Sequence, residues 1–559
     1  MGLRPGFDLL RRRLVVALLS LALLSSYAFG QSKSETQSTT TLSSAERETS
    51  VRVKVETIKE VTNALAADDM QGRGTMQPGG DKAAGYISDR FAKLGLKALG
   101  NKNSYLQPIK FKDQDFSPET TFKLEDETLK MTTDYAVSPP YSGDENASGE
   151  LVFIAYGMMT SSPSRNDLAG IDIKNKIVVM LDGPPKNIAK EAWKKADMWV
   201  NILVTLTKQG AAGVVYVSHG REEHPNSEMM DYYSRRSVSL GDESDWPSEL
   251  PPHITVSNQT AEKMFANSGV SYTQALTMAE SNDFKPFKLK KSAKIVVRFK
   301  NSKGTSNNVV GLLEGSDPKL KEEAIVFSAH YDAFGVGAGN KIYHGAADNA
   351  IGVAEMIAIA EALVGSALRP RRSIIFLAVT GEEYGLYGSK YWAANPTWKI
   401  KKVAADLNFD GMGTEVYGPV KVIVGFGAEH SSLGALLNEV AAAVDIKVIP
   451  DPTPDENSFY RSDHYSFVTK GVPALMLLGA PEGDPAKWVA RMKAWEKTDY
   501  HQPGDVVQSD WNWEGPHTMA VLGVIMGLRL SNSEEMPAWL PSSPFNRERG
   551  TNAEPPPEP

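Results

Sequence analysis

Apolar residues are spaced differently in different parts of the chain. Over residues 51–65 and 81–94 they recur at helical spacing, and Gly95 follows the second run as a helix stop. From about residue 296 onward, short apolar runs alternate with amphipathic stretches. This alternation predicts a mostly parallel sheet with helices on both faces, an α/β fold. The strands expected there are residues 324–328, 373–379, 403–409, 420–424 and 474–478, with a helix over 351–364.

Residues 131–295 follow a different pattern. Apolar runs at 149–154, 176–181 and 210–217 are expected to be buried strands, and a helical stretch precedes the last of them. No set of residues in this part of the sequence suggests catalysis. We therefore expect a β-rich insertion that serves as a lid or guides the substrate, with a second enzyme as the less favoured alternative.

The two ends of the chain have their own composition. Three arginines at 11–13 precede an apolar run at 14–24 and small residues at 28–30, the three parts of a secretory signal peptide over residues 1–30. A membrane anchor is the alternative, but the apolar run is shorter than the ~20 residues that a span needs. We therefore expect an exported protein, periplasmic or secreted, with no stable membrane association after signal removal. Polar residues 31–50 and the proline-rich residues 536–559 predict a disordered leader and tail.

Composition excludes several kinds of chemistry. The chain has 559 residues, enough for two or three domains, and a formal net charge of −8. The negative charge argues against nucleic acid as a partner, because nucleic acid requires a basic face. The sequence contains no cysteine, which excludes disulfides, thiolate zinc sites and a cysteine nucleophile. Oligomeric state is not decided by these features.

Metal-binding side chains occur in five short motifs in the last part of the chain. Imidazole nitrogens and carboxylate oxygens suit zinc and its neighbours, and one carboxylate can bridge two cations ~3.5–4 Å apart. Most of these side chains come just after an expected strand, at the edge of a parallel sheet where ligands bind. The candidate residues are His330, Asp348, Glu382, Glu383, Asp410 and His501.

Each candidate also has a structural interpretation. An isolated His330 could be a strand histidine, but Asp332 lies two residues on, on the same face, and can orient a metal-bound imidazole. Asp348 could cap the helix that it precedes, a position compatible with bridging two metals. Glu382 and Glu383 could be an exposed acidic turn, and their spacing alone does not decide which of them binds metal.

These motifs resemble the M28 family of co-catalytic zinc peptidases over roughly residues 55–535. The resemblance implies a zinc-exopeptidase-like, phosphorylase/hydrolase-like catalytic domain at residues 51–130 and 296–535. Residues 131–295 resemble an inserted protease-associated (PA) domain. Two Zn²⁺ per chain are implied, with Glu382 as the general base that manages the proton of a metal-bridged water. Asp348 would bridge one zinc held by Glu383 and His501 and another held by His330 and Asp410.

Three further residues match the family less specifically. Tyr500 aligns with a tyrosine that donates a hydrogen bond to the oxyanion, and a core tyrosine is the alternative. His464 matches a loop that lines the substrate pocket in relatives, with structural support as the alternative. Arg461, in the same loop, could grip a substrate carboxylate.

The resemblance implies a dizinc exopeptidase with a peptide substrate, and we expect an aminopeptidase that removes N-terminal residues. Arg461 keeps an M28-type carboxypeptidase or dipeptidase as the main alternative. A non-catalytic PA-domain binding protein is a further alternative, disfavoured because all five ligand positions and the base are filled.

Overall fold

The computed structural model describes residues 41–551 apart from 138–143, 162–163, 187, 189–192, 194–197, 219–233, 242–249 and 412. The signal peptide expected at 1–30 therefore lies outside the described residues. So do residues 31–40 of the expected leader and 552–559 of the expected tail.

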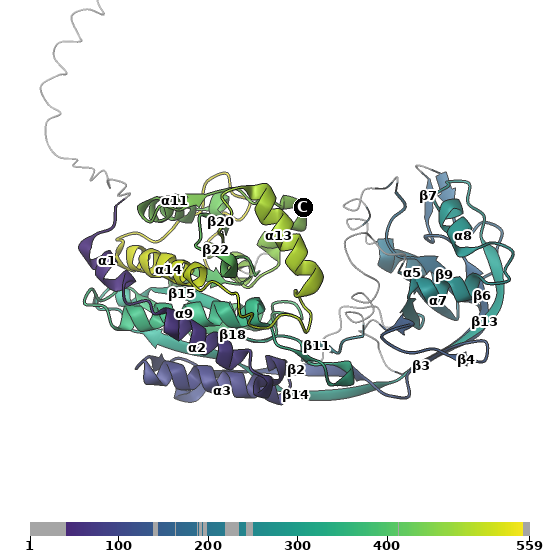
Figure 1. The fold of residues 1–559 in the computed structure, drawn as a ribbon, viewed down its shortest axis with the longest axis horizontal. Helices are drawn as coiled ribbons and strands as arrows, with labels where there is room; N and C mark the ends of the chain where they lie inside the picture. Colours follow the sequence, from purple (N-terminus) through teal and green to yellow (C-terminus); the bar gives the residue numbers. More distant parts are fainter. Residues whose placement is uncertain are drawn as a thin grey trace, which may run out of the picture. The chain divides into compact units, whose positions relative to one another are not determined.

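The larger sheet carries the residues expected to form the catalytic domain (Figure 1). In the described part of the chain its strand order is β11-β2-β14-β18-β15-β19-β22-β20-β21, with β1 paired to β14. The central strands β18, β15, β19 and β22 are parallel neighbours, as the alternating pattern predicts. The bounds are β1 (Lys97–Ala98), β2 (Leu106–Phe116), β11 (Ser237–Leu240), β14 (Phe299–Leu313), β15 (Ala324–His330), β18 (Ser373–Val379), β19 (Val403–Phe409), β20 (Val422–Phe426), β21 (Lys447–Val448) and β22 (Ala474–Ala480).

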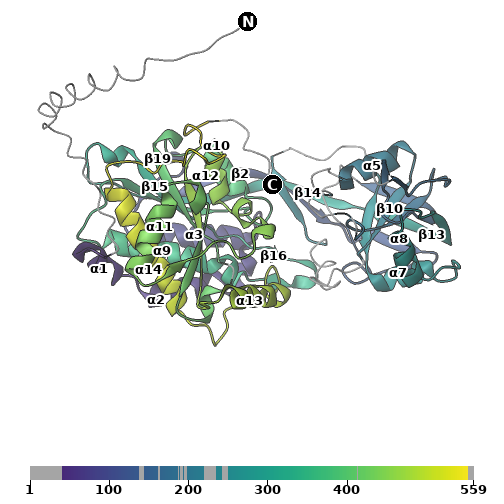
Figure 2. The ribbon, with the colours of Figure 1, turned by 90° about the horizontal axis from the view of Figure 1, so that it is seen from above.

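Both faces of this sheet are covered, because its central strands are apolar on both sides. Ile325 and Phe327 of β15 belong to one hydrophobic cluster, and Val326 between them belongs to another. Figure 2 shows α9 and α14 side by side over the first face. The first cluster includes residues of α2 (Val55–Leu65), α3 (Pro78–Lys93), α9 (Ile351–Val364), α11 (Leu433–Ala443) and α14 (Glu514–Asn532). The second includes residues of α10 (Tyr387–Ala394), α12 (His464–Val468) and α13 (Pro485–Thr498).

A second sheet is formed by the inserted residues, in the order β4-β3-β13-β6-β9-β10-β12-β5. Strands β6, β9, β10 and β12 are parallel. Apolar residues of α5 pack on one face, and those of α7 and α8 on the other. The bounds are β3 (Thr121–Leu124), β4 (Glu127–Thr128), β5 (Tyr135–Ala136), β6 (Glu145–Phe153), β9 (Ile177–Leu181), β10 (Gly213–Val217), β12 (His253–Val256), β13 (Phe287–Val297), α5 (Met198–Lys208), α7 (Asn258–Phe265) and α8 (Tyr272–Ala279).

Two details of the insertion differ from the prediction. The second sheet begins at β3, so residues 121–130 leave the larger sheet about ten residues earlier than the expected boundary at 131. Strand β11 lies within residues 131–295 but pairs with β2 of the larger sheet. Pairing with a strand distant in sequence leaves no local pattern, so the sequence could not indicate it.

Parts of the expected leader and tail are structured. Ser43 and Glu46 form a capping box at the start of α1 (Ser44–Ser50). Near the other end, the Trp539 indole N–H donates to the Gly471 carbonyl at 3.0 Å, and Phe545 is buried. The disorder predicted for these residues is wrong, because composition does not reveal tertiary contacts with distant residues. None of the described helices is long and apolar enough to cross a membrane.

Candidate metal centre

Three parallel strands place three parts of the centre at one edge of the larger sheet. His330 is the last residue of β15, Asp410 directly follows β19, and Glu382 and Glu383 come shortly after β18. The carboxyl ends of parallel strands meet at the same edge, which explains why residues distant in sequence converge here. Asp348 comes from a turn (Ala346–Ala350) before α9 in which its own backbone is not helical, rather than from the start of a regular helix.

The carboxylate of Asp348 lies between the two histidines. Its Oδ1 is 3.1 Å from His330 Nε2, and its Oδ2 is 3.3 Å from His501 Nε2. Each oxygen therefore faces a different imidazole. This is the arrangement that a carboxylate needs to bridge two cations.

The other acidic residues complete two groups around these histidines. Asp410 Oδ1 is 3.1 Å from His330 Nε2, and Glu383 Oε2 is 3.0 Å from His501 Nε2. Glu382 Oε2 lies farther out, 4.0 Å from His330 Nε2. Among the described residues, His330, Glu382 and Asp410 form one group able to hold a metal ion, and Asp348, Glu383 and His501 form another.

Grouping Glu382 with His330 differs from the family-based expectation, which assigns Asp348 to that metal as well. The geometric grouping and the family-based expectation agree if Asp348 contributes one carboxylate oxygen to each metal. Asp348 Oδ1 lies about 0.9 Å nearer to His330 Nε2 than Glu382 Oε2 does. We therefore favour Asp348 over Glu382 as the third ligand beside His330 and Asp410.

Burial and mutual repulsion disturb the acid–base behaviour of this centre. Burial, together with the neighbouring carboxylates, raises the pKa of Glu382 well above its usual range and that of Glu383 to about 7. Burial lowers the pKa of His501, but Glu383 and Asp348 outweigh burial and raise it to about 9. Burial disfavours ionisation of Asp348, yet hydrogen bonds to His330 and His501 hold its pKa below its usual value. The carboxylates thus compete for the positive charge of two imidazoles.

The second nitrogen of His330 is held by the main chain. His330 Nδ1 is 3.1 Å from the Asp332 carbonyl oxygen and 3.8 Å from the Asp332 carboxylate. An N–H at Nδ1 that donates to this carbonyl leaves the lone pair of Nε2 facing Asp348 and Asp410. The Asp332 carboxylate instead accepts hydrogen bonds from the Glu382 N–H and the Thr75 hydroxyl, each at 3.2 Å. Asp332 therefore links the His330 strand to the Glu382 turn.

Two supporting residues were not assigned a role from the sequence. The Asp505 carboxylate accepts the backbone N–H groups of Ala347 at 2.8 Å and Asp348 at 3.0 Å. The Ser462 hydroxyl donates to Asp410 Oδ2 at 2.5 Å. Asp505 closes the same motif as His501, so its place in that motif was the available signal. Ser462 lies between Arg461 and His464 in the loop that matches the family, so its place in that loop was a signal of the same kind.

Arg73 is a third such residue, and it is completely buried. Its guanidinium donates to the carbonyls of Tyr331, Leu65, His344 and Gly345. These bonds join the loop after β15 to the segment leading to Asp348. Arg73 lies in a turn-rich stretch between two helices, where the sequence suggested only a connection.

The three less specific candidates lie in different environments. Tyr500 stacks on His501 with ring centroids 3.7 Å apart, and burial raises its pKa well above the usual range. Arg461 is partly exposed and donates to the Tyr500 hydroxyl at 3.4 Å, so it lies at the rim of the centre. His464 is completely buried, with its ring centroid 5.3 Å from that of Phe459. This burial favours structural support, the alternative interpretation of His464, over the predicted pocket role.

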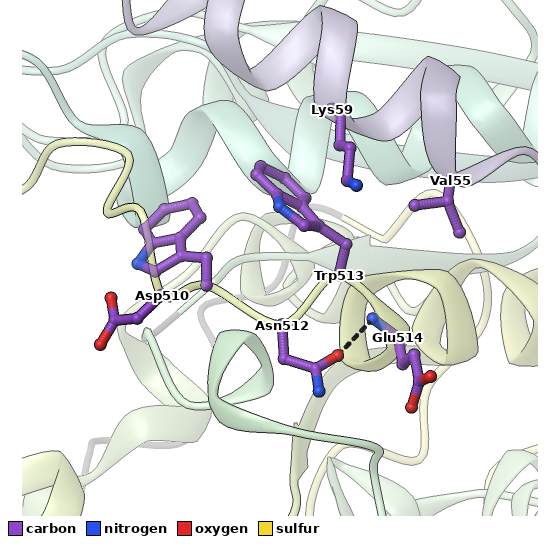
Figure 3. A pocket seen from close by; sticks show the side chains of 7 residues that line it. Val55, Lys59, Asp510, Asn512, Trp513 and Glu514 are labelled. Carbon is purple, nitrogen blue, oxygen red and sulfur yellow. Dashed lines mark hydrogen bonds between the residues drawn. The ribbon is translucent and has the colours of Figure 1, made fainter.

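A separate pocket of about 410 Å³ lies between α2 and the start of α14 (Figure 3). Trp511 and Trp513 meet edge to face in its wall, and the Lys59 ammonium lies 5.9 Å from the Trp513 ring centroid. The Asn512 side chain accepts the Glu514 N–H at 2.9 Å at the start of α14. None of the residues that line this pocket belongs to the metal centre.

Comparison with known proteins identifies residues 308–524 as a match to Peptidase family M28. A probable leucine aminopeptidase 2 of Aspergillus oryzae is 26% identical over 229 residues, which are 38% of this chain and 42% of that protein. A vacuolar membrane protease of Clavispora lusitaniae is 38% identical over 108 residues, 19% of this chain and 10% of that protein. A solved structure of a zinc aminopeptidase from Bacillus subtilis has a TM-score of 0.53 at 16% identity, covering 85% of this chain and 94% of that one.

These findings confirm the predicted resemblance to family M28 and the predicted fold class. The matched stretches span less than half the length of either relative. The predicted location is corrected: several fungal relatives are named vacuolar membrane protease, which points away from a periplasmic or secreted protein. A cationic stretch followed by an apolar run occurs in several kinds of targeting segment. The composition of the N-terminus therefore could not identify the compartment.

Proposed function

We propose that this chain is a co-catalytic zinc peptidase, an aminopeptidase that removes N-terminal residues from peptides. One observation carries the proposal: the two oxygens of Asp348 face the Nε2 atoms of His330 and His501 at 3.1 and 3.3 Å. A single carboxylate placed in this way can join two metal sites. The M28 match and the aminopeptidase relative support the same reading.

The residues present fit zinc. Nitrogen and oxygen donors without sulfur are a common zinc environment, and His330 Nε2 faces two carboxylate oxygens at 3.1 Å. One N–H could serve only one of these oxygens well, whereas a cation satisfies both. Glu383, His501 and Asp348 would hold one ion, and His330, Asp410 and Asp348 the other. Two zinc ions supply Lewis-acid chemistry that polarises a peptide carbonyl and makes water a nucleophile at neutral pH.

Glu382 is proposed as the general base. It is nearly buried and lies beside the ligands, but at 4.0 Å from His330 Nε2 it is more distant than Asp348 or Asp410. A carboxylate in this position can take a proton from the attacking water and return it to the leaving amine. Asp332 accepts the Glu382 N–H and so fixes the turn from which this side chain projects.

Tyr500 is proposed to donate a hydrogen bond to the oxyanion of the tetrahedral intermediate. Its ring is fixed by stacking against His501 on one side and by Trp495 at a centroid distance of 5.1 Å. A donor that is held before the reaction stabilises developing charge without reorganisation.

A carboxypeptidase is the second candidate, because Arg461 lies beside the Tyr500 hydroxyl at the rim of the centre. A guanidinium in that place could bind the C-terminal carboxylate of a peptide. In an aminopeptidase, the acidic groups of the centre would instead attract a free α-amino group.

A substrate panel with metal analysis tests the proposal. Purified full-length chain is expected to hold two zinc ions and to hydrolyse aminoacyl anilides and short free peptides. N-acetylated versions of the same peptides are expected to be cleaved far more slowly. Fully active protein with clearly fewer than two ions per chain would contradict the two-metal centre. Release of the C-terminal residue first, or equal rates on acetylated and free peptides, would favour the carboxypeptidase.

A further inference from the structure

One segment of the insertion reaches the metal centre. Residues 237–240 form β11, which pairs antiparallel with residues 111–114 of β2 in the larger sheet. Val238 is buried in a small apolar cluster with Ile109 and Phe111. The neighbouring Arg236 lies with its Nε 3.1 Å from Asp113 Oδ1 and donates to the Thr75 carbonyl. The position of residue 235 is thus determined by pairing with the larger sheet.

Arg235 contacts the segment that supplies His501. It is 9% exposed, and its guanidinium donates to the His501 carbonyl. The guanidinium carbon is 4.2 Å from the Phe334 ring centroid and 4.5 Å from the Tyr343 ring centroid, distances at which a cation interacts with an aromatic face.

Phe334, one of the two rings that Arg235 contacts, also contacts the imidazole of His501. Phe334 meets it edge to face at a centroid distance of 4.7 Å, and Tyr500 stacks against it at 3.7 Å. His501 also has a left-handed backbone with φ of +57°, which costs free energy for a residue with a Cβ. A backbone of this kind persists where its surroundings hold it in place. Arg235 supplies two such contacts, one to the carbonyl and one through Phe334.

We infer that Arg235 is a positioning residue for His501, through which the insertion takes part in metal binding at the group formed by Asp348, Glu383 and His501. The inference rests on the proposed role of His501 as a zinc ligand. Contacts outside the ligand set orient metal-binding side chains, and their loss typically weakens metal affinity 10–100-fold. The group around His330 has a separate support in Asp332 and is expected to keep its affinity.

Zinc titration of the metal-free, full-length chain against a chromophoric chelator tests this inference. Arg235→Met keeps much of the apolar stem but removes the charge and the donor. We expect one of the two sites to weaken by ~10–100-fold, with the other within about threefold of the unchanged protein. In the cobalt-substituted protein, the absorption bands of the weakened site are expected to shift.

Arg236→Met is the matched control. It removes an arginine from the adjacent position, which donates a hydrogen bond to the Thr75 carbonyl and forms an ion pair with Asp113, and contacts no proposed ligand in either way. Both sites are expected to keep their affinity in this variant. Equal loss at both sites in Arg235→Met, in parallel with a lower unfolding temperature, would mean a purely structural role and would overturn the inference. Unchanged zinc affinity at both sites would also overturn it.

Two further variants keep the outcome decisive. If Arg235→Met does not fold, Arg235→Lys replaces the fork of donors by one ammonium and is expected to weaken the same site by a smaller factor. Unchanged affinity in that variant would overturn the inference. His501→Ala separates this inference from the proposed function. If His501→Ala retains both ions, the proposed ligand set fails; if it loses one ion while Arg235→Met retains both, only the role of Arg235 fails.

Discussion

The two sheets of this protein bury their charged side chains in different ways. In the insertion, Arg165 Nε lies 2.8 Å from Asp167 Oδ1, and both side chains are almost completely inaccessible. The other Asp167 oxygen accepts the backbone N–H groups of Tyr156 and Met158, and Arg165 also donates to the Ala279 carbonyl. This buried acid is therefore matched by a cation and by donors from the same domain.

The larger sheet buries acids that have no such match. Burial raises the pKa of Glu355 well above its usual range and that of Glu415 and Asp463 to about 7. Four more carboxylates surround two histidines at the metal centre. Buried charge without compensation is costly, so an excess of acids indicates cations supplied from outside the chain. Asp167 of the insertion thus has a cation within the chain, whereas at the proposed centre four carboxylates share two histidines.

Metal removal is expected to separate the two regions most strongly, because it should change the metal centre and leave the insertion unchanged. Treatment with 1,10-phenanthroline should abolish peptidase activity, and added zinc should restore it, because the proposed reaction needs zinc held by the groups of the centre. Hydrogen–deuterium exchange should then increase at residues 346–350 and 382–383 and stay unchanged at residues 177–181 of the insertion. Full activity in the chelated protein, or exchange that increases mainly in the insertion, would contradict the comparison.

The next effect concerns the two adjacent glutamates. Glu382→Gln keeps the shape of the side chain but removes the proton acceptor, so turnover should fall by ~10²–10⁴-fold while both metal ions remain bound. Glu383→Gln is the matched control, since its carboxylate lies 3.0 Å from His501 Nε2 and its loss should weaken one metal site. Metal analysis and kinetics on both variants check the assignment. Metal loss in Glu382→Gln alone would reverse the two roles.

The fold of the larger sheet was accessible from the sequence because its central strands bury both faces. Residues 373–379 are apolar apart from Ser373, and β18 has those bounds. The sequence could not show that β11 joins this sheet, because an edge strand of four residues has no distinctive pattern. The helix at 44–50 was missed for a related reason: a polar segment was judged by composition, while its Glu46 contacts Arg529 at the far end of the chain.

The candidate metal-binding residues were accessible from the sequence because imidazole and carboxylate side chains show their chemistry in their residue type, and most of them lie at or just after the end of a strand. The residues that hold these side chains in place were harder to predict from the sequence. Arg73 donates only to backbone carbonyls, and carbonyls carry no sequence signal. For His464 a motif match predicted a pocket residue, whereas its burial favours the alternative of structural support. Motifs indicated the candidate ligands, whereas only the fold revealed the residues that contact them.

Loss of the buried Arg165–Asp167 ion pair is expected to affect the metal centre less than the changes at the two glutamates. Arg165→Met leaves Asp167 buried without its cation and should destabilise the insertion by about 3–5 kcal/mol. Its metal content should stay unchanged. Lys176→Met is a control, because its partner Glu150 is mostly exposed and an exposed ion pair contributes little to stability. Hydrogen exchange of β6 and β9 measures both variants; loss of zinc in Arg165→Met would show that the two regions are not independent.

The smallest expected effect is a dependence of the insertion's stability on pH. His253 in β12 is buried, burial lowers its pKa to about 4, and its Nδ1 lies 3.1 Å from the Pro251 carbonyl oxygen. Between pH 6.5 and 4 the unfolded chain binds a proton that the folded state does not, so this residue makes stability rise with pH. Acidification through that window should therefore cost about 1.4 kcal/mol per pH unit from His253. His253→Asn keeps a donor near the carbonyl without a titrating ring, so its hydrogen exchange at residues 253–256 should depend less on pH. An identical pH dependence in both proteins would exclude His253 as the source.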